Sequence, residues 1–204
     1  GTHPRAYDEK YKEHDIGSHP DLQTKLQAKG QTPASTHVPV LAKEAMEALS
    51  PRPGEAVADC TVGYGGHALA FMKRIGPSGR LIGFDVDADE LDRARLRLEC
   101  EATPSSLHHS NFAGLAKVMA EEALLGYDII FADLGVSSMQ IDNPERGIGY
   151  RNDGPLDMRM DRRRQENCVD LLATISRDKL AEVLRELADE PEADEIAVLV
   201  VDRR

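Results

Sequence analysis

The sequence has few cysteines and no long apolar run, and each shortage excludes a class of protein. Its three cysteines, Cys60, Cys100 and Cys168, are widely spaced and include no Cys-x-x-Cys pair, which argues against a disulfide framework and against a structural zinc site. A reducing, cytoplasmic compartment is therefore expected. No apolar run is long enough to span a bilayer, so no membrane partner is expected.

Basic residues are also scarce, since 25 lysines and arginines face 36 aspartates and glutamates, for a formal net charge of -11. A general nucleic-acid binder needs clustered basic residues, so this balance speaks against one. The acidic run from Glu182 to Glu195 is interpreted as a solvated surface. One short stretch is nevertheless basic, and it forms either a local patch for RNA or another solvated surface. It contains Arg146, Arg151, Arg159, Arg162, Arg163 and Arg164.

Hydrophobic residues make up 41% of the chain and charged residues 30%, which indicates a globular core. Short apolar stretches alternate with segments of helical periodicity. This alternation predicts a parallel sheet with right-handed crossovers, which is an α/β, doubly wound fold. The predicted strands are Glu55–Cys60, Arg80–Phe84, Ser106–His109 and Tyr127–Ala132, and the predicted helices are Leu41–Leu49, His67–Ile75, Ala88–Cys100 and Phe112–Leu125.

Three parts of the chain differ in composition. Residues 1–35 are polar and lack an apolar period, so we interpret them as an extension. Residues 36–161 contain the predicted sheet and end in a long segment, 134–161, that is rich in Gly, Pro, Asp and Arg. Loops of this length are uncommon in compact domains and are usually functional. Residues 162–204 are helical from Cys168 on, with a break at Pro191, so we predict a domain boundary near Arg162.

A glycine-rich turn, Thr61–Gly66, follows the first predicted strand and precedes a helix. Glycines let a ligand approach the backbone, and the helix N-terminus offers free N–H groups. Asp85 ends the second strand, 20 positions after Gly65, where a carboxylate can accept hydrogen bonds from two ribose hydroxyls. Together these features favour a cofactor that contains adenosine, although a glycine turn by itself can be a tight packing turn.

Asp59, at the end of the first predicted strand, bears on which cofactor binds. A carboxylate there would repel a pyrophosphate, because two unit charges about 4 Å apart repel by about 4 kcal/mol at an effective dielectric near 20. S-adenosylmethionine instead carries an ammonium and a sulfonium, both of which Asp59 would attract. The alternative role for Asp59 is to cap the following helix.

Asp133 ends the fourth predicted strand, at the edge of the sheet where open α/β folds bind their ligands. A carboxylate there can contact the cofactor or accept an N–H hydrogen bond from a substrate amine. Capping of the following turn is an equally simple role for Asp133.

Several motifs resemble the 16S rRNA cytosine-N4 methyltransferases, the MraW family. The similarity is most specific in the long loop, in DLGVSSMQ (Asp133–Gln140), NPERG (Asn143–Gly147) and DGPLDMRMD (Asp153–Asp161). HVPVL (His37–Leu41) and GGH (Gly65–His67) resemble the same family. The resemblance runs from about His37 onward and implies a Rossmann-like methyltransferase sheet with part of a helical insert domain.

The resemblance implies methylation of the exocyclic amine of one cytosine in small-subunit ribosomal RNA, or in an assembly intermediate, with S-adenosyl-L-methionine as the cofactor. Asp133 would be the catalytic acceptor. Phe112 would stack on the adenine, unless it is a core aromatic residue, and His67 would donate an N–H to the methionine carboxylate. Gln140 is assigned by the resemblance alone. The implied cofactor contacts are Gly65, Gly66, His67, Asp85, Phe112, Asp133 and Gln140.

The sequence departs from the family in one respect. Family members return from the helical insert to complete the sheet, whereas this chain stops at Arg204, so we expect either a fragment or a naturally short protein. An incomplete sheet would expose an edge at Tyr127–Ala132 and favour self-association, including a homodimer. We also expect the chain by itself to bind the cofactor weakly and to methylate poorly or not at all.

Two other functions compete with this one. A non-catalytic RNA-binding or ribosome-assembly protein would keep the loop without turnover, but the intact Asp85, Asp133 and glycine turn argue against it. A nicotinamide oxidoreductase is disfavoured by Asp59 and by the long loop. DNA is also disfavoured as a substrate, because no proline pair follows Asp133 as it does in many DNA amino-methylases.

Overall fold

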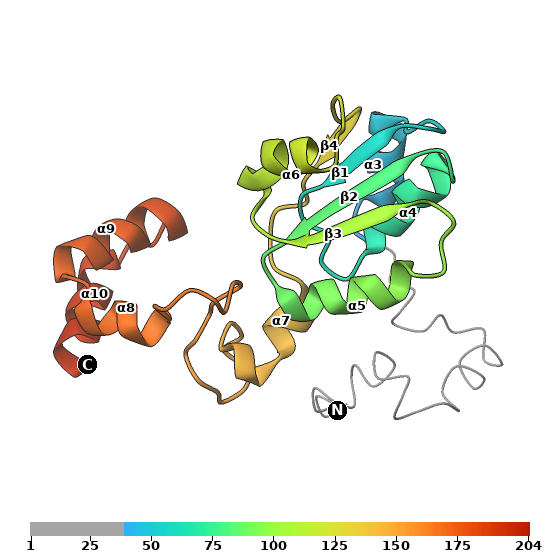
Figure 1. Ribbon diagram of the computed structural model, residues 1–204. Coiled ribbons are helices and arrows are strands. Elements are labelled where there is room, and N and C mark those ends of the chain that lie inside the picture. Colours follow the sequence, from blue (N-terminus) through green and yellow to red (C-terminus); the bar gives the residue numbers. More distant parts are fainter. Residues whose placement is uncertain (1–38) are drawn as a thin grey trace, which may run out of the picture. The chain divides into compact units, whose positions relative to one another are not determined.

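The computed structural model describes residues 39–204 (Figure 1). The chain forms two compact units, Gly1–Ser137 and Ser138–Arg204, and each is considered by itself. The division precedes the boundary near Arg162 that the sequence suggests, because the long loop packs within the second unit. The extension predicted at residues 1–35, and His37 and Val38 of the HVPVL motif, lie outside the described residues.

The first unit is built on a four-stranded parallel sheet with strand order β3-β2-β1-β4. The register pairs Asp59 with Gly83 on one side and with Phe131 on the other. The carboxyl ends of these strands therefore meet at one edge of the sheet. The α/β, doubly wound prediction is confirmed. The strands are β1 (Ala56–Asp59), β2 (Arg80–Asp85), β3 (Ser105–His109) and β4 (Ile129–Phe131).

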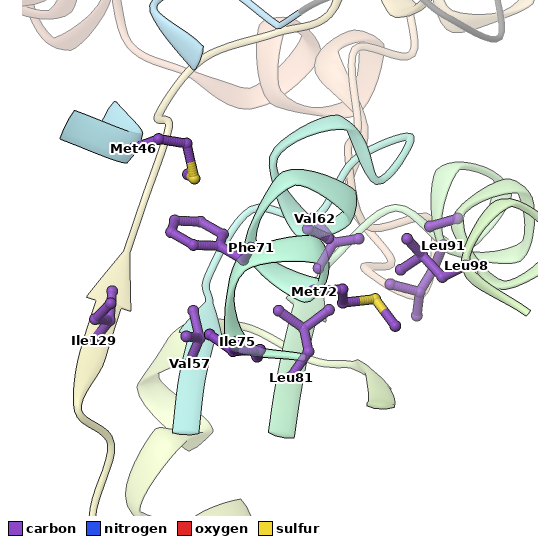
Figure 2. Packing of buried hydrophobic residues seen from close by; sticks show 12 residues of the cluster. Met46, Val57, Val62, Phe71, Met72, Ile75, Leu81, Leu91, Leu98 and Ile129 are labelled. Carbon is purple, nitrogen blue, oxygen red and sulfur yellow. The ribbon is translucent and has the colours of Figure 1, made fainter. Parts of the chain in front are cut away.

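Helices cover both faces of this sheet, because alternate strand residues point to opposite sides. Val57 and Leu81 belong to a core with residues of the first three helices, whereas Ala58 and Ile82 pack with Val118 of α6. Figure 2 shows Phe71 and Ile75 of α4 among the side chains of the first core. The helices are α3 (Ala42–Leu49), α4 (Gly66–Ile75), α5 (Ala88–Leu98), η3 (Phe112–Gly114) and α6 (Leu115–Glu121).

The second unit contains the long loop and three helices. Two short turns, α7 (Ser138–Asp142) and η4 (Pro144–Arg146), lie inside the segment predicted to have little periodicity. A capping box formed by Asn167 and Asp170 starts the helical part, and Leu180, Ala181 and Ala197 form its small core. The predicted helices and their break near Pro191 are confirmed as α8 (Cys168–Thr174), α9 (Arg177–Ala188) and α10 (Ala193–Arg203).

A search of residues 39–204 finds no helix with both the length and the apolar character needed to cross a membrane.

Candidate active site

The glycine turn joins β1 to α4 in a tight backbone path. Gly63 and Gly65 have φ angles of +48° and +83°, which L-residues with a Cβ rarely adopt. Gly66 has an ordinary φ, but a Cβ there would lie 2.5 Å from the Pro39 Cγ atom. The first two positions therefore need glycine for backbone conformation, and Gly66 needs it because Pro39 packs directly against it.

Asp85 ends β2 and binds the turn through its carboxylate. Its Oδ2 accepts a hydrogen bond from the Gly63 N–H at 2.6 Å, and its Oδ1 accepts one from the Asp87 N–H at 2.9 Å. Burial raises the pKa of Asp85, and these backbone hydrogen bonds oppose the rise. Each oxygen has a second lone pair, so the oriented carboxylate can still accept hydrogen bonds from a vicinal diol.

Asp59 is completely buried at the end of β1. Its Oδ1 accepts a hydrogen bond from the Thr61 N–H at 3.1 Å, and its Oδ2 has no hydrogen-bond partner among the described residues. Burial raises the pKa of Asp59 to about 7, with smaller contributions from the nearby negative charges of Asp85 and Asp133. Asp59 does not cap α4, whose N-cap is Gly65. An unpaired buried carboxylate oxygen is costly, and a cation placed there would reduce that cost.

His67 and Asp133 approach each other beside the turn. His67 lies in the first turn of α4 and is 7% exposed, and its ring packs against Phe131 with 4.6 Å between ring centroids. Its Nε2 is 3.5 Å from the Asp133 Oδ2, which is too long for a strong hydrogen bond. Burial lowers the pKa of His67 despite the opposing effect of Asp133. A neutral imidazole is therefore favoured, with one ring N–H available as a donor.

Asp133 follows β4, and its side chain is 58% exposed. Its backbone N–H donates to the Thr61 Oγ1 at 2.7 Å, so the end of β4 is tied to the turn after β1. The exposed carboxylate can meet a substrate, while the backbone behind it is held in place.

Phe112 lies just beyond β3, in the first position of η3. The Ser110 N–H donates to the Asp85 carbonyl oxygen at 2.9 Å, which ties this segment to the end of β2. The Phe112 side chain is 42% exposed. It is therefore a surface aromatic near the carboxyl edge of the sheet, and the alternative of a core aromatic residue is wrong.

The sequence is also similar to that of known proteins. Residues 34–204 match the MraW methylase family. The chain belongs to that family. It is 41% identical over 204 residues to ribosomal RNA small subunit methyltransferase H 2 of Alkaliphilus metalliredigens, and 38% identical over 205 residues to the H 1 protein of Lachnoclostridium phytofermentans. These matches cover 98% and 99% of the chain but 58% and 56% of the two relatives. The chain thus spans just over half their length.

Similarity to solved structures is weaker. A SAM-dependent O-methyltransferase from Thermotoga maritima matches 54% of this chain and 37% of its own, with a TM-score of 0.39 and 15% sequence identity. Similarity at this level is too low to support a conclusion about the fold or the function. The fold assignment of this MraW family member rests on the order and the parallel pairing of its strands.

Six of the seven cofactor residues expected from the MraW resemblance lie in the first unit: on the glycine turn, in the first turn of α4, at the end of β2 or just beyond β3 and β4. Gln140 lies in α7 of the second unit, where it is buried, and it stays a prediction from the resemblance. The sequence did not single out Thr61. A hydroxyl two residues beyond the buried Asp59 was a feature that could have indicated Thr61. Its hydrogen-bond partner, Asp133, lies 72 positions away along the chain.

The basic stretch of this MraW family member is less available than its sequence suggests. Arg146 is only 4% exposed, so it cannot contribute to an exposed patch. The guanidinium groups of Arg159 and Arg163 make paired hydrogen bonds to Asp157 and Asp161, with N–O distances between 2.7 and 2.8 Å. The other three arginines, Arg151, Arg162 and Arg164, are exposed.

Proposed function

We propose that this protein is an S-adenosylmethionine-dependent methyltransferase acting on the N4 amine of a cytosine in small-subunit ribosomal RNA or in an assembly intermediate. Membership of the MraW methylase family and the names of its relatives support this function. The observation that carries it is the buried, unpaired carboxylate oxygen of Asp59, with Asp85 and Asp133 nearby.

The charges of the site fit S-adenosylmethionine better than a dinucleotide. Three carboxylates, Asp59, Asp85 and Asp133, gather around the glycine turn. A pyrophosphate would be repelled there by about 4 kcal/mol for each charge pair about 4 Å apart at an effective dielectric near 20. An ammonium or sulfonium would be attracted instead. This argues against the nicotinamide oxidoreductase that the sequence left open.

Each residue has a role that its surroundings allow. Asp85 would accept hydrogen bonds from the ribose hydroxyls, and the exposed ring of Phe112 would stack on the adenine. The backbone of Gly65 and Gly66, at the start of α4, would contact the cofactor, as the resemblance implies. His67 would donate its ring N–H to the methionine carboxylate.

Asp133 would act on the substrate. The lone pair of the cytosine amine is delocalised into the ring, so the amine is a poor nucleophile. When bound, the cofactor would supply an electrophilic methyl group, whose bond to sulfur breaks with its electron pair left on sulfur. Asp133 would accept a hydrogen bond from the amine, localise its lone pair and take its proton as the new C–N bond forms. The exposure of the Asp133 side chain allows that proton to pass to water.

The Asp85→Ala variant tests cofactor binding. It removes an acceptor for two charge-assisted hydrogen bonds, worth about 1.5–3 kcal/mol each. Isothermal titration with S-adenosylhomocysteine should therefore show a loss of affinity of at least a hundredfold. Asp92→Ala is the control, because Asp92 lies on α5 with a side chain that is 73% exposed, and it makes the same charge change. Equal affinity in the parent and in Asp85→Ala would show that the ribose binds elsewhere.

A single-turnover assay separates an enzyme from a non-catalytic RNA-binding protein. We expect labelled methyl groups to appear on cytosine N4 in small-subunit RNA or assembly intermediates, and Asp133→Asn to abolish the transfer. RNA binding without any transfer, by the parent and by a chain extended past Arg204, would support the ribosome-assembly alternative.

A further inference from the structure

The contact between Thr61 and Asp133 lies where the ladder between β1 and β4 ends. The last regular hydrogen bond runs from the Cys60 N–H to the Phe131 carbonyl oxygen at 2.8 Å. In a continuing parallel ladder, the Asp133 N–H would donate to the Cys60 carbonyl oxygen. It donates instead to the Thr61 Oγ1 at 2.7 Å. A side-chain hydroxyl has therefore replaced a backbone acceptor at the first position beyond the strand pair.

The hydrogen bond to the Thr61 hydroxyl affects how the Asp133 carboxylate is positioned. The Asp133 side chain is 58% exposed, and its Oδ2 lies 3.5 Å from the His67 Nε2. A carboxylate with so little packing around it is placed mainly by its own backbone. The Thr61 hydroxyl holds that backbone.

We propose that Thr61 is a positioning residue for methyl transfer: its hydroxyl fixes the backbone of Asp133 and so keeps the Asp133 carboxylate beside His67. The proposal rests on the proposed function for its effect on turnover. Its geometric part, the placement of Asp133 relative to His67, does not depend on any activity.

Thr61 can be tested without disturbing the glycine turn. Its contact to Asp59 uses the backbone N–H, which every substitution except proline keeps. Thr61→Val removes the hydroxyl at nearly constant volume, and Thr61→Ser keeps it. Thr103→Val is a matched control, because Thr103 is buried and its Oγ1 donates to the Met72 carbonyl oxygen at 2.8 Å. It loses a side-chain hydrogen bond to another part of the same unit.

The first measurement is the titration of His67 by NMR. The negative charge of Asp133 raises the His67 pKa, so displacement of that charge should lower it. We expect Thr61→Val to lower the His67 pKa toward its value in Asp133→Asn, and Thr61→Ser and Thr103→Val to leave it at the parent value. An unchanged His67 pKa in Thr61→Val would overturn the proposal. Thr61→Ala deletes the same hydroxyl and replaces Thr61→Val if that variant does not fold.

The second measurement is catalytic. Misplacement of a reacting group by about 1 Å can cost about a hundredfold in rate, so we expect Thr61→Val to lower kcat by about 10- to 100-fold. The KM for RNA and the Kd for S-adenosylhomocysteine should stay within about threefold, and Thr61→Ser should restore the rate. If the affinity for S-adenosylhomocysteine fell by the same factor as kcat, Thr61 would have a merely structural role. If neither the parent nor a chain extended past Arg204 transfers a methyl group, the proposed function fails, and the His67 titration still decides the placement of Asp133.

Discussion

Two buried carboxyl groups of the first unit, Asp59 and Glu90, both have pKa values of about 7. Burial is the main cause in each case, and the positive charge of Arg93, 2.8 Å from Glu90, offsets part of it. Each has one oxygen without a hydrogen-bond partner among the described residues, but Glu90 has a cationic partner, whereas Asp59 has only a backbone hydrogen bond. At neutral pH, Asp59 is therefore the less compensated of the two.

Asp59 should make the stability of the protein depend on pH. Its pKa rises from an ordinary value of 3.8 in the unfolded chain to about 7 in the folded protein. The stability that this carboxyl contributes is fully present below about pH 4 and is lost as the pH rises toward 7, by about 4 kcal/mol at most. In urea unfolding measured between pH 4.5 and 7.5, the free energy of unfolding should fall more steeply with rising pH for the parent than for Asp59→Asn.

Asp92→Asn provides the control for that experiment. It makes the same chemical change at an exposed position of α5, so its free energy of unfolding should follow the pH dependence of the parent. Equal slopes for the parent and Asp59→Asn would mean that Asp59 is already ionised throughout this range.

At the scale of elements, the long loop of the second unit is an ordered structure that packs on itself. A Cβ on Gly147 would collide with the Pro155 carbonyl oxygen, and one on Gly154 would collide with the Pro144 carbonyl oxygen. The Met158 N–H also donates to the Arg146 carbonyl oxygen at 2.9 Å. Backbone therefore lies against backbone, and glycine is the residue that permits this approach.

Alanine at these glycines should open the loop. Gly147→Ala adds a collision at a residue with a φ of +64°, and Gly154→Ala adds a collision alone. We expect each to destabilise the loop by about 1–3 kcal/mol, seen as faster limited proteolysis between residues 138 and 161. Gly135→Ala is the control, because a Cβ there meets nothing within 4 Å. Proteolysis at the parent rate in both loop variants would show that the loop tolerates the side chains.

At the scale of the whole molecule, a net charge of -11 must be reconciled with the proposed RNA substrate. Ion pairs take up part of the basic stretch, since Arg159 and Arg163 face carboxylates and Asp157 has its pKa lowered to about 2, chiefly by the hydrogen bonds from Arg159. Arg151 and Arg164 are exposed, and neither forms an ion pair with another described residue. Contact with phosphate should therefore depend on these two more than on the paired arginines.

Two double variants with equal charge change test this distribution. Arg151→Gln with Arg164→Gln should weaken RNA binding and reduce the slope of log K against log salt by about 1.5, because each lost phosphate contact removes about 0.7–0.9. Arg159→Gln with Arg163→Gln should change that slope by less than half as much, since those groups already face carboxylates. Equal effects from the two pairs would indicate a response to net charge rather than to individual contacts.

Strand β4 lies at one edge of the sheet. Within the described residues β4 pairs with β1 alone, and Ile130 is 56% exposed. Self-association through this edge stays a prediction, which sedimentation velocity over a range of concentrations can check.

The sequence by itself determined the fold class and predicted where most of the candidate site residues lie. Short apolar strands and amphipathic helices are local patterns, and each is repeated often enough to specify a parallel sheet. The glycine turn and Asp85 follow from the same local logic, because the chain order places them at the ends of neighbouring strands. The motifs around Asp133 indicated which family the chain belongs to.

The tertiary structure decided what depends on partners distant in the chain. Thr61 and Asp133 meet across 72 positions, and only the register of β1 with β4 brings them together. The burial of Arg146, the exposure of Phe112 and the division at Ser137–Ser138 likewise depend on packing. Periodicity reports which face of an element is apolar. It carries no information about which side chain reaches across to another element, because that is set by strand register and the packing of elements far apart in the chain.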